Sequence, residues 1–416
     1  MNSVYNLLIT LTAAFIRLGA FFNPKLKLFV NGRKHVFSTL QQKINPDDKI
    51  IWFHAASLGE FEQGLPVMES VKKEFSTYKI LVTFFSPSGY EVKKNHKLPD
   101  IITYLPLDTK ENAKKFISMV NPSLVIFIKY EFWPNYLTVL KQKNVPVIAI
   151  AAIFRKSQIF FKFYGGFMRK ALKKVEYFFV QDQNSIELLS SIGINNTKLS
   201  GDTRFDRVSE ILERDNTLEF ITEFKQDKLC IVAGSTWPEG EAALISYINQ
   251  ADESLKFIIA PHTIKAEKIT KLKNQFTVKT VLFSEMNRGN LKEATVFIID
   301  TIGILTKIYS YAAIAYVGGG LGKTGLHNTL EPAVFGIPVI IGPNYHKFKE
   351  ARELVDLGGI LVINNAEELK TTLNNLVENK SNRKATGKIN DDYIKKNRGA
   401  RGHILQFIRI LLDNKK

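Results

Sequence analysis

The sequence contains very little cysteine and no cluster of metal-binding side chains. Its 416 residues include a single cysteine, Cys230, so an internal disulfide is excluded. Cys230 lies in the apolar run 229–233, which favours a place in the core over a role as a nucleophile. Cysteines and histidines do not occur at the spacing of metal ligands. We therefore expect a chain on the cytosolic side of the membrane that holds no metal.

Acidic side chains are also scarce relative to basic ones. Lysine and arginine number 57 against 40 aspartates and glutamates, which gives a formal net charge of +17. Such an excess indicates a polyanionic partner, namely an anionic membrane surface, a phosphorylated substrate or nucleic acid. No sequence signature of RNA or DNA binding accompanies the charge, so we expect no nucleic acid partner. A lysine-rich genome bias is an alternative source of part of the excess.

A long apolar run occurs at the N-terminus. Residues 4–22 are nearly all apolar, and Arg17 is the one charged residue among them. Their length approaches the roughly 20 residues that span a bilayer, and basic residues follow them, which would keep the rest of the chain in the cytoplasm. No charged segment precedes the run, which disfavours a signal peptide. We expect residues 1–24 to attach to a membrane, by spanning it or by lying on it, with a soluble buried helix as the alternative.

The rest of the chain alternates between strand and helix patterns. Continuous apolar strands separated by helices are typical of a parallel sheet covered on both faces, so the predicted fold class is α/β. The polar segment 202–228 marks a domain boundary. We predict two doubly wound, Rossmann-like domains over residues 25–206 and 207–390, followed by a C-terminal helical tail, 391–416, that packs toward the first domain. The predicted strands are residues 50–54, 80–84, 101–105, 124–128, 145–151, 177–180, 229–233, 257–260, 296–299, 314–317 and 339–341.

One stretch, residues 316–343, combines a strand, three glycines and a polar loop. Glycines 318–320 follow the strand directly, and a helix is predicted to begin at Asn328 or Thr329 and to end near Gly336. Glycine allows the backbone to approach a ligand closely, and a helix N-terminus offers N–H groups to a phosphate. The stretch therefore predicts a nucleotide or sugar-nucleotide site, and a plain glycine-rich turn is the alternative.

Polar residues that packing does not require follow the predicted strands of the first domain. Glu60 could act as a general base, or it could complete a capping box with Ser57. Glu131 follows the strand 124–128 with Lys129, and a strand-terminal ion pair is the alternative there. Arg204 could meet a phosphate or a carboxylate, or it could be a solvated charge in the linker. In the second domain, the loop 234–241 fits a helix N-cap. Residues 261–262 and 300–303 stand at the ends of predicted strands there, as the polar residues of the first domain do.

Together these loops resemble one family, the 3-deoxy-D-manno-octulosonic acid (Kdo) transferases of lipopolysaccharide synthesis. Its patterns are matched, in order, by ASLGE (56–60), EFWPN (131–135), GDTRFD (201–206), GSTWPEGE (234–241), APH (260–262), DTIG (300–303) and HNTLEPAVFGIPVIIGP (327–343). The resemblance covers almost the whole chain. Two positions depart from it: Arg204 stands where many members have lysine, and Ile304 stands where many have glutamate.

The resemblance implies a GT-B fold and an inverting transfer of Kdo from CMP-Kdo to the phosphorylated lipid A precursor, lipid IVA. It places the enzyme at the cytoplasmic face of the inner membrane, with residues 25–206 binding the acceptor and 207–390 binding CMP-Kdo. It makes Glu60 the general base and gives Glu131 and Arg204 roles in stabilising the transition state. The implied CMP-binding positions are Pro261, His262, Ile302, Gly303, Ile304, Asn328, Thr329, Leu330 and Glu331.

The leaving group CMP carries one phosphate, so we expect no metal and no other cofactor besides the donor substrate. The predicted arrangement puts Glu60 across a cleft from the CMP site, with the three glycines letting their loop pass close to the donor. Two other functions compete: a GT-B transferase that uses a UDP-sugar on a lipid acceptor, and a non-catalytic protein that binds polyanions or membranes. The sequence leaves the oligomeric state, the number of Kdo residues added and the acyl pattern of the acceptor open.

Overall fold

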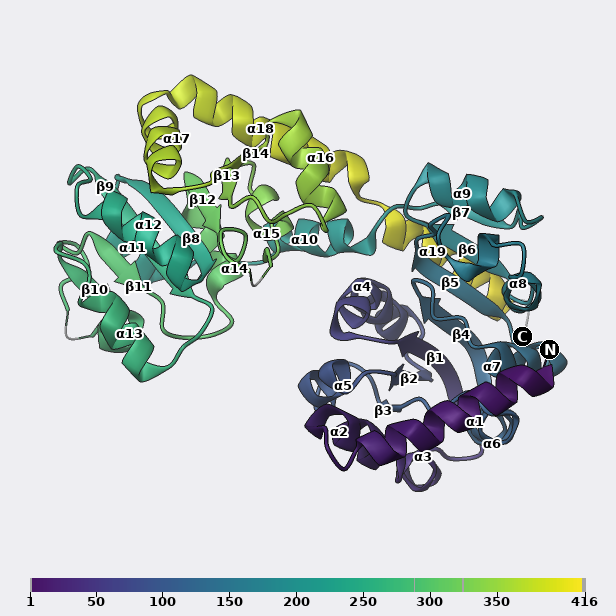
Figure 1. Ribbon diagram of the computed structural model, residues 1–416. Coiled ribbons are helices and arrows are strands. Elements are labelled where there is room, and N and C mark those ends of the chain that lie inside the picture. Colours follow the sequence, from purple (N-terminus) through teal and green to yellow (C-terminus); the bar gives the residue numbers. More distant parts are fainter. Residues whose placement is uncertain (1, 288, 324, 414–416) are drawn as a thin grey trace. The chain divides into compact units, whose positions relative to one another are not determined.

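A computed structural model of the chain describes residues 2–287, 289–323 and 325–413. Residue 1 and residues 414–416, which belong to the predicted first and last segments, lie outside that description. The chain divides into two compact units, residues 1–206 with 398–416 and residues 207–397 (Figure 1). Each unit has a parallel sheet covered by helices, and the described residues of each form seven strands. The predicted α/β class with two parallel sheets is confirmed.

The first unit is built on the sheet order β3-β2-β1-β4-β5-β6-β7. Its strands are nearly continuous apolar runs, as expected for a sheet that is buried on both faces. Its elements are α1 (Asn2–Gly19), α2 (Pro24–Arg33), α3 (Val36–Lys43), β1 (Lys49–Ala55), α4 (Leu58–Glu74), β2 (Tyr78–Phe84), α5 (Pro87–Lys93), β3 (Ile101–Tyr104), α6 (Lys110–Val120), β4 (Pro122–Ile128), α7 (Pro134–Gln142), β5 (Val147–Ala152), η1 (Ile159–Phe161), α8 (Gly166–Leu172), β6 (Tyr177–Val180), α9 (Gln183–Ser190), β7 (Thr197–Leu199) and α19 (Ala400–Asp413).

The second unit is built on the order β10-β11-β9-β8-β12-β13-β14. Helix α10 (Thr203–Glu213) begins in the first unit and continues into this one. The other elements are α11 (Glu219–Lys225), β8 (Leu229–Thr236), α12 (Pro238–Ile248), β9 (Leu255–Pro261), α13 (Ala266–Lys273), β10 (Thr280–Leu282), η2 (Phe283–Glu285), β11 (Val296–Ile298), α14 (Leu305–Ile308), η3 (Tyr309–Tyr311), β12 (Ile314–Val317), α15 (Leu330–Ala333), β13 (Val339–Ile341), α16 (Lys349–Leu357), β14 (Ile360–Val362), α17 (Ala366–Glu378) and α18 (Lys380–Asn397).

Each predicted strand is present, and three strands escaped the prediction. These are β7, β10 and β14, of three residues each. They lie at sheet edges, where partial exposure breaks the apolar run that marks a central strand. Helix α18 runs through residue 391 without a break, so the predicted start of the tail there is wrong, and the tail helix is α19. Ile404 and Ile408 of α19 pack in a core of the first unit with Phe61 of α4. Cys230 is fully buried, as expected.

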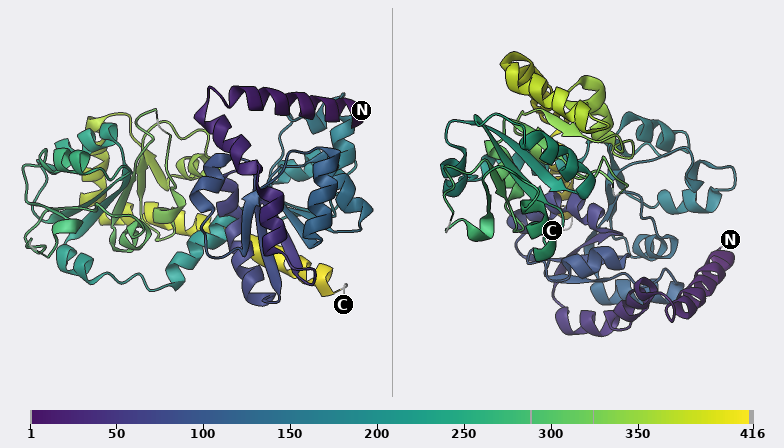
Figure 2. Two further views of the ribbon diagram at one scale, coloured as in Figure 1. Left: turned by 90° about the horizontal axis from the view of Figure 1, so that it is seen from below. Right: turned by 60° about the vertical axis from the view of Figure 1, so that its left-hand side comes forward.

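Helix α1 is attached to the first unit through polar and aromatic groups, while its apolar side chains point outward. The Tyr5 hydroxyl donates to Asp108 (2.8 Å), and the Asn135 amide donates to Asn6 (2.9 Å). Leu7, Leu8, Leu11, Phe15 and Leu18 are all exposed. Figures 1 and 2 show α1 lying along the outside of this unit. Among the described residues, none of the helices combines the length and apolar character required to cross a bilayer.

Candidate active site

The candidate catalytic residues of the first unit follow the carboxyl ends of its central strands. Glu60 lies in the first turn of α4, just after β1, and Glu131 lies in the loop after β4. Because β1 and β4 are parallel neighbours, their carboxyl ends meet at one edge of the sheet. The negative charge of Glu60 acts on Glu131, which places the two carboxylates near each other. The sheet topology therefore brings together two residues that are 71 positions apart in the sequence.

Glu60 is almost fully buried, with 5% of its surface exposed. Burial raises the pKa of Glu60 above its usual range, and the N–H groups of Ala56 and Ser57 and the charge of Lys129 oppose that rise. The Glu60 carboxylate accepts a hydrogen bond from the Ala56 N–H. Ser57 is the N-cap residue but makes no side-chain capping bond, so only half of a capping box is present. One oxygen of Glu60 thus fixes the loop, and the raised pKa suits a proton acceptor.

Glu131 is the more strongly perturbed of the two carboxyl groups. Burial, and after it the charge of Glu60, raises the pKa of Glu131 to about 7. Lys129, which was the alternative partner of Glu131, has a left-handed backbone with φ of 66°, and its charge acts on Glu60 instead. Near neutral pH Glu131 is therefore about half protonated, so it can hold or release a proton there. Two carboxyl groups whose environments separate their pKa values are typical of acid–base chemistry.

This assignment predicts how stability depends on pH. The pKa of Glu131 is about 7 in the folded unit and about 4.5 when unfolded, so its favourable contribution is complete below pH 4.5 and is lost as pH rises through 7. We expect Glu131→Gln to gain roughly 2–3 kcal/mol in unfolding free energy relative to wild type between pH 4.5 and pH 8. Urea unfolding in a Trp237→Phe background measures it, because the remaining tryptophans, Trp52 and Trp133, both lie in the first unit. If the difference in unfolding free energy between Glu131→Gln and wild type were the same at both pH values, the raised pKa of Glu131 would be contradicted.

Hydrogen bonds from Trp133 and Asn135 hold the EFWPN segment that carries Glu131. The Trp133 indole N–H donates to His54 Nε2 (3.2 Å), and the other ring nitrogen of His54 lies 2.8 Å from the Thr83 hydroxyl. Since the indole can only donate, Nε2 accepts and Nδ1 carries the proton. Burial lowers the pKa of His54 to about 3, so the ring stays neutral. Asn135 completes the support, because its backbone N–H donates to Asp108 (3.0 Å).

Arg204 is held by a neighbouring carboxylate and is not a solvated linker charge. Its Nε donates to Asp202 (2.9 Å), and Asp202 also accepts from the Gln63 amide (3.0 Å) on α4, one turn beyond Glu60. Asp202 is 5% exposed, so the carboxylate of this ion pair is buried. Because Asp202 balances the charge, Arg204 can offer directed N–H donors but little net positive charge.

In the second unit, aromatic rings meet where three neighbouring strands end. Trp237 follows β8, His262 follows β9 and His327 belongs to the loop after β12. The Trp237 and His262 rings stack with centroids 4.6 Å apart, and His262 and His327 are also separated by 4.6 Å. The Trp237 N–H donates to His327 Nε2 (3.1 Å). Sequence analysis selected His262 but left Trp237 and His327 out of the candidate set, although both stand inside the quoted motifs.

The other candidate residues of this unit lie in loops after β11 and β12. Asn328 donates to Glu331 (3.1 Å) and accepts from the Leu330 N–H (3.1 Å), so Asn328, Thr329, Leu330 and Glu331 form one closed turn. Burial raises the pKa of Glu331, while Asn328 and the charge of Arg207 oppose that rise. Ile302, Gly303 and Ile304 precede α14, and Ile302 is 87% exposed. Pro261 ends β9 beside His262.

One expectation for the stretch 316–343 needs correction. The predicted helix from residue 328 to 336 is a single turn, α15, and its Leu330 N–H is already bonded to Asn328. The glycines are required by packing within the unit. A Cβ on Gly318 would lie 2.1 Å from the Ser235 carbonyl oxygen, and one on Gly319 would lie 2.0 Å from the Gly325 carbonyl oxygen. The loop after β12 therefore packs tightly against the end of β8, which brings His327 to Trp237.

The described residues contain no group of three or more histidine, cysteine, aspartate or glutamate side chains that could hold a metal ion. The absence of a metal or other cofactor from the reaction stays a prediction. The carboxylates of the first unit and the aromatic cluster of the second can serve proton transfer and the binding of a planar base, respectively.

Known proteins resemble this chain over most of its length. Residues 31–207 match the family described as 3-deoxy-D-manno-octulosonic-acid transferase (kdotransferase). The 3-deoxy-D-manno-octulosonic acid transferase of Aquifex aeolicus is 32% identical over 335 residues, 79% of this chain and 86% of the relative. That of Haemophilus influenzae is 30% identical over 385 residues, 88% of each chain.

Solved structures of other proteins share the fold at low sequence identity. UDP-GlcNAc 2-epimerase from Neisseria meningitidis aligns with a TM-score of 0.58 at 13% identity, over 86% of this chain and 99% of that one. MurG from Acinetobacter baumannii aligns with a TM-score of 0.53 at 12% identity, over 87% and 99%. These likenesses concern the fold alone, and they support a GT-B-like architecture of two parallel sheets.

Proposed function

Because this chain belongs to the Kdo transferase family, we propose that it moves Kdo from CMP-Kdo to the phosphorylated lipid A precursor, lipid IVA, with Glu60 as general base. The chain is a glycosyltransferase, and Kdo transfer in lipopolysaccharide synthesis follows from the family. The observation that best supports the proposed mechanism is the Glu60–Glu131 pair at the carboxyl edge of the first sheet, with its separated pKa values.

The proposed step is a direct, inverting displacement. Glu60 takes the proton from the acceptor hydroxyl as its oxygen forms a bond to the anomeric carbon of Kdo. The bond from that carbon to the phosphate oxygen breaks, and the electron pair leaves with CMP. Glu131, which is about half protonated near neutral pH, can in its protonated form donate a hydrogen bond to developing negative charge, and the guanidinium of Arg204 can also donate one. A single phosphate leaves, so directed N–H donors can stabilise it without a metal.

We assign donor binding to the second unit. A cytosine ring is a planar π system that stacks on aromatic side chains, and the Trp237–His262–His327 cluster offers such surfaces at the carboxyl ends of its strands. The turn of Asn328, Thr329, Leu330 and Glu331 and the loop of Ile302, Gly303 and Ile304 would hold the remainder of CMP. The position of Ile304 contributes its backbone alone, since an apolar side chain has no polar group to offer.

Replacement of His262 tests the donor assignment. We expect His262→Ala to raise the KM for CMP-Kdo about tenfold, because base–aromatic stacking contributes roughly 1–3 kcal/mol. His403→Ala, an exposed histidine on α19 of the first unit, is the matched control and should leave KM unchanged. Competition of CMP against UDP in the same assay separates a CMP-Kdo enzyme from a UDP-sugar transferase. Stronger inhibition by UDP than by CMP would contradict the proposed donor.

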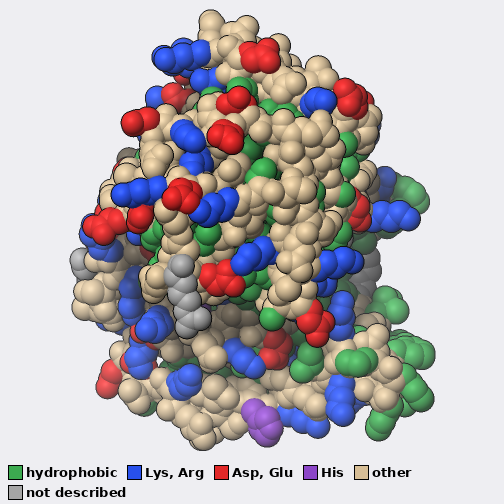
Figure 3. All heavy atoms as spheres, turned by 90° about the vertical axis from the view of Figure 1, so that its left-hand side faces the viewer, with side chains coloured by type: hydrophobic (Ala, Val, Ile, Leu, Met, Phe, Trp, Pro, Cys, Tyr) green, Lys and Arg blue, Asp and Glu red, His purple; other side chains and the backbone are tan. Residues whose placement is uncertain are grey.

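We further propose that the enzyme works at the cytoplasmic face of the inner membrane, with α1 lying on the bilayer surface. The exposed leucines of α1 and its Phe15 face away from the unit that its polar residues bind, an arrangement that favours insertion into the lipid interface. Figure 3 shows lysine and arginine interspersed with acidic side chains on the face in view, which differs from the continuous basic stripe expected for a nucleic acid partner.

A further inference from the structure

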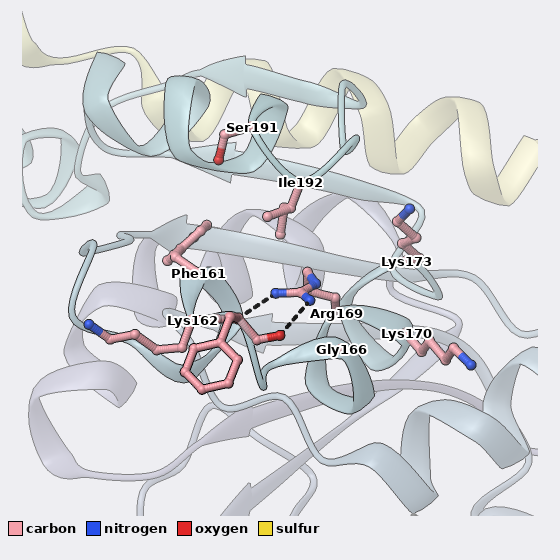
Figure 4. Close-up of a pocket in the computed structure, with 9 residues that line it drawn as sticks. Phe161, Lys162, Gly166, Arg169, Lys170, Lys173, Ser191 and Ile192 are labelled. Atoms are coloured by element: carbon pink, nitrogen blue, oxygen red, sulfur yellow. Dashed lines mark hydrogen bonds between the residues drawn. The ribbon is translucent and has the colours of Figure 1, made fainter.

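A basic cavity in the first unit lies between two helices that the proposed chemistry does not use. Its volume is about 660 Å³, within the range of small-molecule sites. The lining residues come from the segment that runs from η1 to the residue after α8 and from the two residues that follow α9, and they are Phe161, Lys162, Phe163, Gly166, Arg169, Lys170, Lys173, Ser191 and Ile192. Figure 4 shows Phe161, Arg169 and Ile192 toward the centre, with the three lysines around the rim.

The charge of this cavity is not compensated. Four of its nine lining residues are cationic, and none is acidic. Lys162, Lys170 and Lys173 form no ion pair with any residue that the structure describes. Lys170 lies in α8 and Lys173 is the C-cap residue of that helix, three positions on, a spacing at which like charges repel. A cluster of this kind is stabilised when an anionic group occupies it.

Arg169 gives the cavity a fixed wall. Its guanidinium donates to the backbone carbonyls of Lys162 (2.7 Å), Phe160 (3.1 Å) and Phe163 (3.4 Å), two of them drawn in Figure 4. These bonds hold the turn between η1 and α8 in one conformation. The guanidinium of Arg169 is therefore occupied by backbone carbonyls, whereas the lysines remain available to a ligand.

The rim of the cavity carries aromatic side chains that are unusually exposed. Phe163 is 94% exposed and Tyr164 is 61% exposed. Helix α8, which supplies part of the cavity lining, contacts α1 through Phe167, whose ring centroid lies 5.2 Å from that of Tyr5. The cavity thus adjoins the helix whose apolar face is proposed to lie on the bilayer. Exposed aromatic rings beside lysines are typical of surfaces that enter the headgroup region of a membrane.

We propose that this cavity binds the phosphate headgroup of an anionic phospholipid, with Phe163 and Tyr164 entering the interface beside it. Lys162, Lys170 and Lys173 match the negative charge, and the fixed turn around Arg169 presents the rings. The inference rests on the proposed membrane location, and it assigns the bulk lipid a site separate from the Glu60 centre. It commits to a bilayer lipid as the occupant, since a free phosphate would not require the exposed rings.

The experiment is vesicle co-sedimentation of the full chain with phosphatidylcholine alone and with about 30% phosphatidylglycerol added. We expect Ser191→Glu, which puts a carboxylate into the cavity, to reduce the preference for anionic vesicles about tenfold. Ser190→Glu is the matched control. It adds the same charge one residue earlier, at an exposed position that does not line the cavity. Equal binding by these two variants would overturn the proposal.

A second pair of variants tests the lysines. Lys170→Gln/Lys173→Gln should bind anionic vesicles about 20-fold less tightly, as a lysine near an anionic surface contributes roughly a fivefold factor. Lys73→Gln/Lys97→Gln removes two exposed charges elsewhere in the unit and should have a much smaller effect. If both double variants lose binding equally, the attraction is diffuse and no site exists. Kdo transfer to detergent-dispersed acceptor should be unchanged in every variant, so a failure of the proposed function shows in the wild type instead.

Discussion

Replacement of Glu60 by glutamine should reduce the rate of Kdo transfer by about 10²- to 10⁴-fold, the range expected when a general base is lost. Glutamine has nearly the same shape, and its carbonyl oxygen can still accept the hydrogen bond from the Ala56 N–H. The loop after β1 should therefore stay in place, so the loss reports chemistry and not folding. The measurement is kcat for transfer from CMP-Kdo to lipid A precursor.

Two comparisons make this result specific. Glu69→Gln changes a glutamate near the other end of the same helix, α4, and should alter kcat less than twofold. In the wild type, kcat should fall as pH drops through the raised pKa of Glu60, because the base must be ionised. The Glu60→Gln variant should lose that acid limb. Near-normal turnover in Glu60→Gln would exclude Glu60 as the base.

Substitution of Gly318 by alanine should destabilise the second unit by about 3 kcal/mol or more. The added Cβ would lie 2.1 Å from the Ser235 carbonyl oxygen and 2.8 Å from Thr236 Cα, so the ends of β12 and β8 must move apart. Backbone atoms cannot yield as a flexible side chain can, and overpacking of a closed site is costly. Since β8 and β12 carry Trp237 and the His327 loop, stabilisation by CMP should weaken as well.

Urea unfolding followed by hydrogen exchange on peptides from β8 and β12 measures this change within the second unit. Gly402→Ala is the matched control, because a Cβ there meets nothing within 4 Å and the residue lies inside α19. Alanine in a helix interior is favoured over glycine, so the control should keep or slightly raise stability. Equal stability of Gly318→Ala and wild type would show that the strand ends can separate freely.

The sequence determined the α/β class, the eleven predicted strands and the family. Central parallel strands are buried on both faces, so their apolar runs are continuous and can be recognised without a structure. The polar residues that follow those strands could be selected for the same reason, because strand ends are where function is placed. The short edge strands β7, β10 and β14 were missed, since partial exposure removes the apolar signal.

The sequence also left several local alternatives open that depend on three-dimensional neighbours. Whether Ser57 and Glu60 form a capping box is decided by rotamers and by which N–H groups lie within reach, and the structure has the Glu60 bond alone. Whether Lys129 pairs with Glu131 depends on backbone conformation, and a left-handed Lys129 places its charge by Glu60. Arg204 resembled a linker charge until Asp202 and Gln63 were found beside it.

The three glycines of residues 318–320 show the same division. Their presence after a strand could be read from the sequence, and it suggested close approach to a ligand. The tertiary structure adds that they approach the unit's own backbone, because β12 and β8 are adjacent strands and the loop after β12 packs against the end of β8. Composition and periodicity fix which residues are buried and which follow a strand. The pKa values of Glu60 and Glu131 and the Trp237–His262–His327 stack arise only when strands distant in the sequence become neighbours in a sheet.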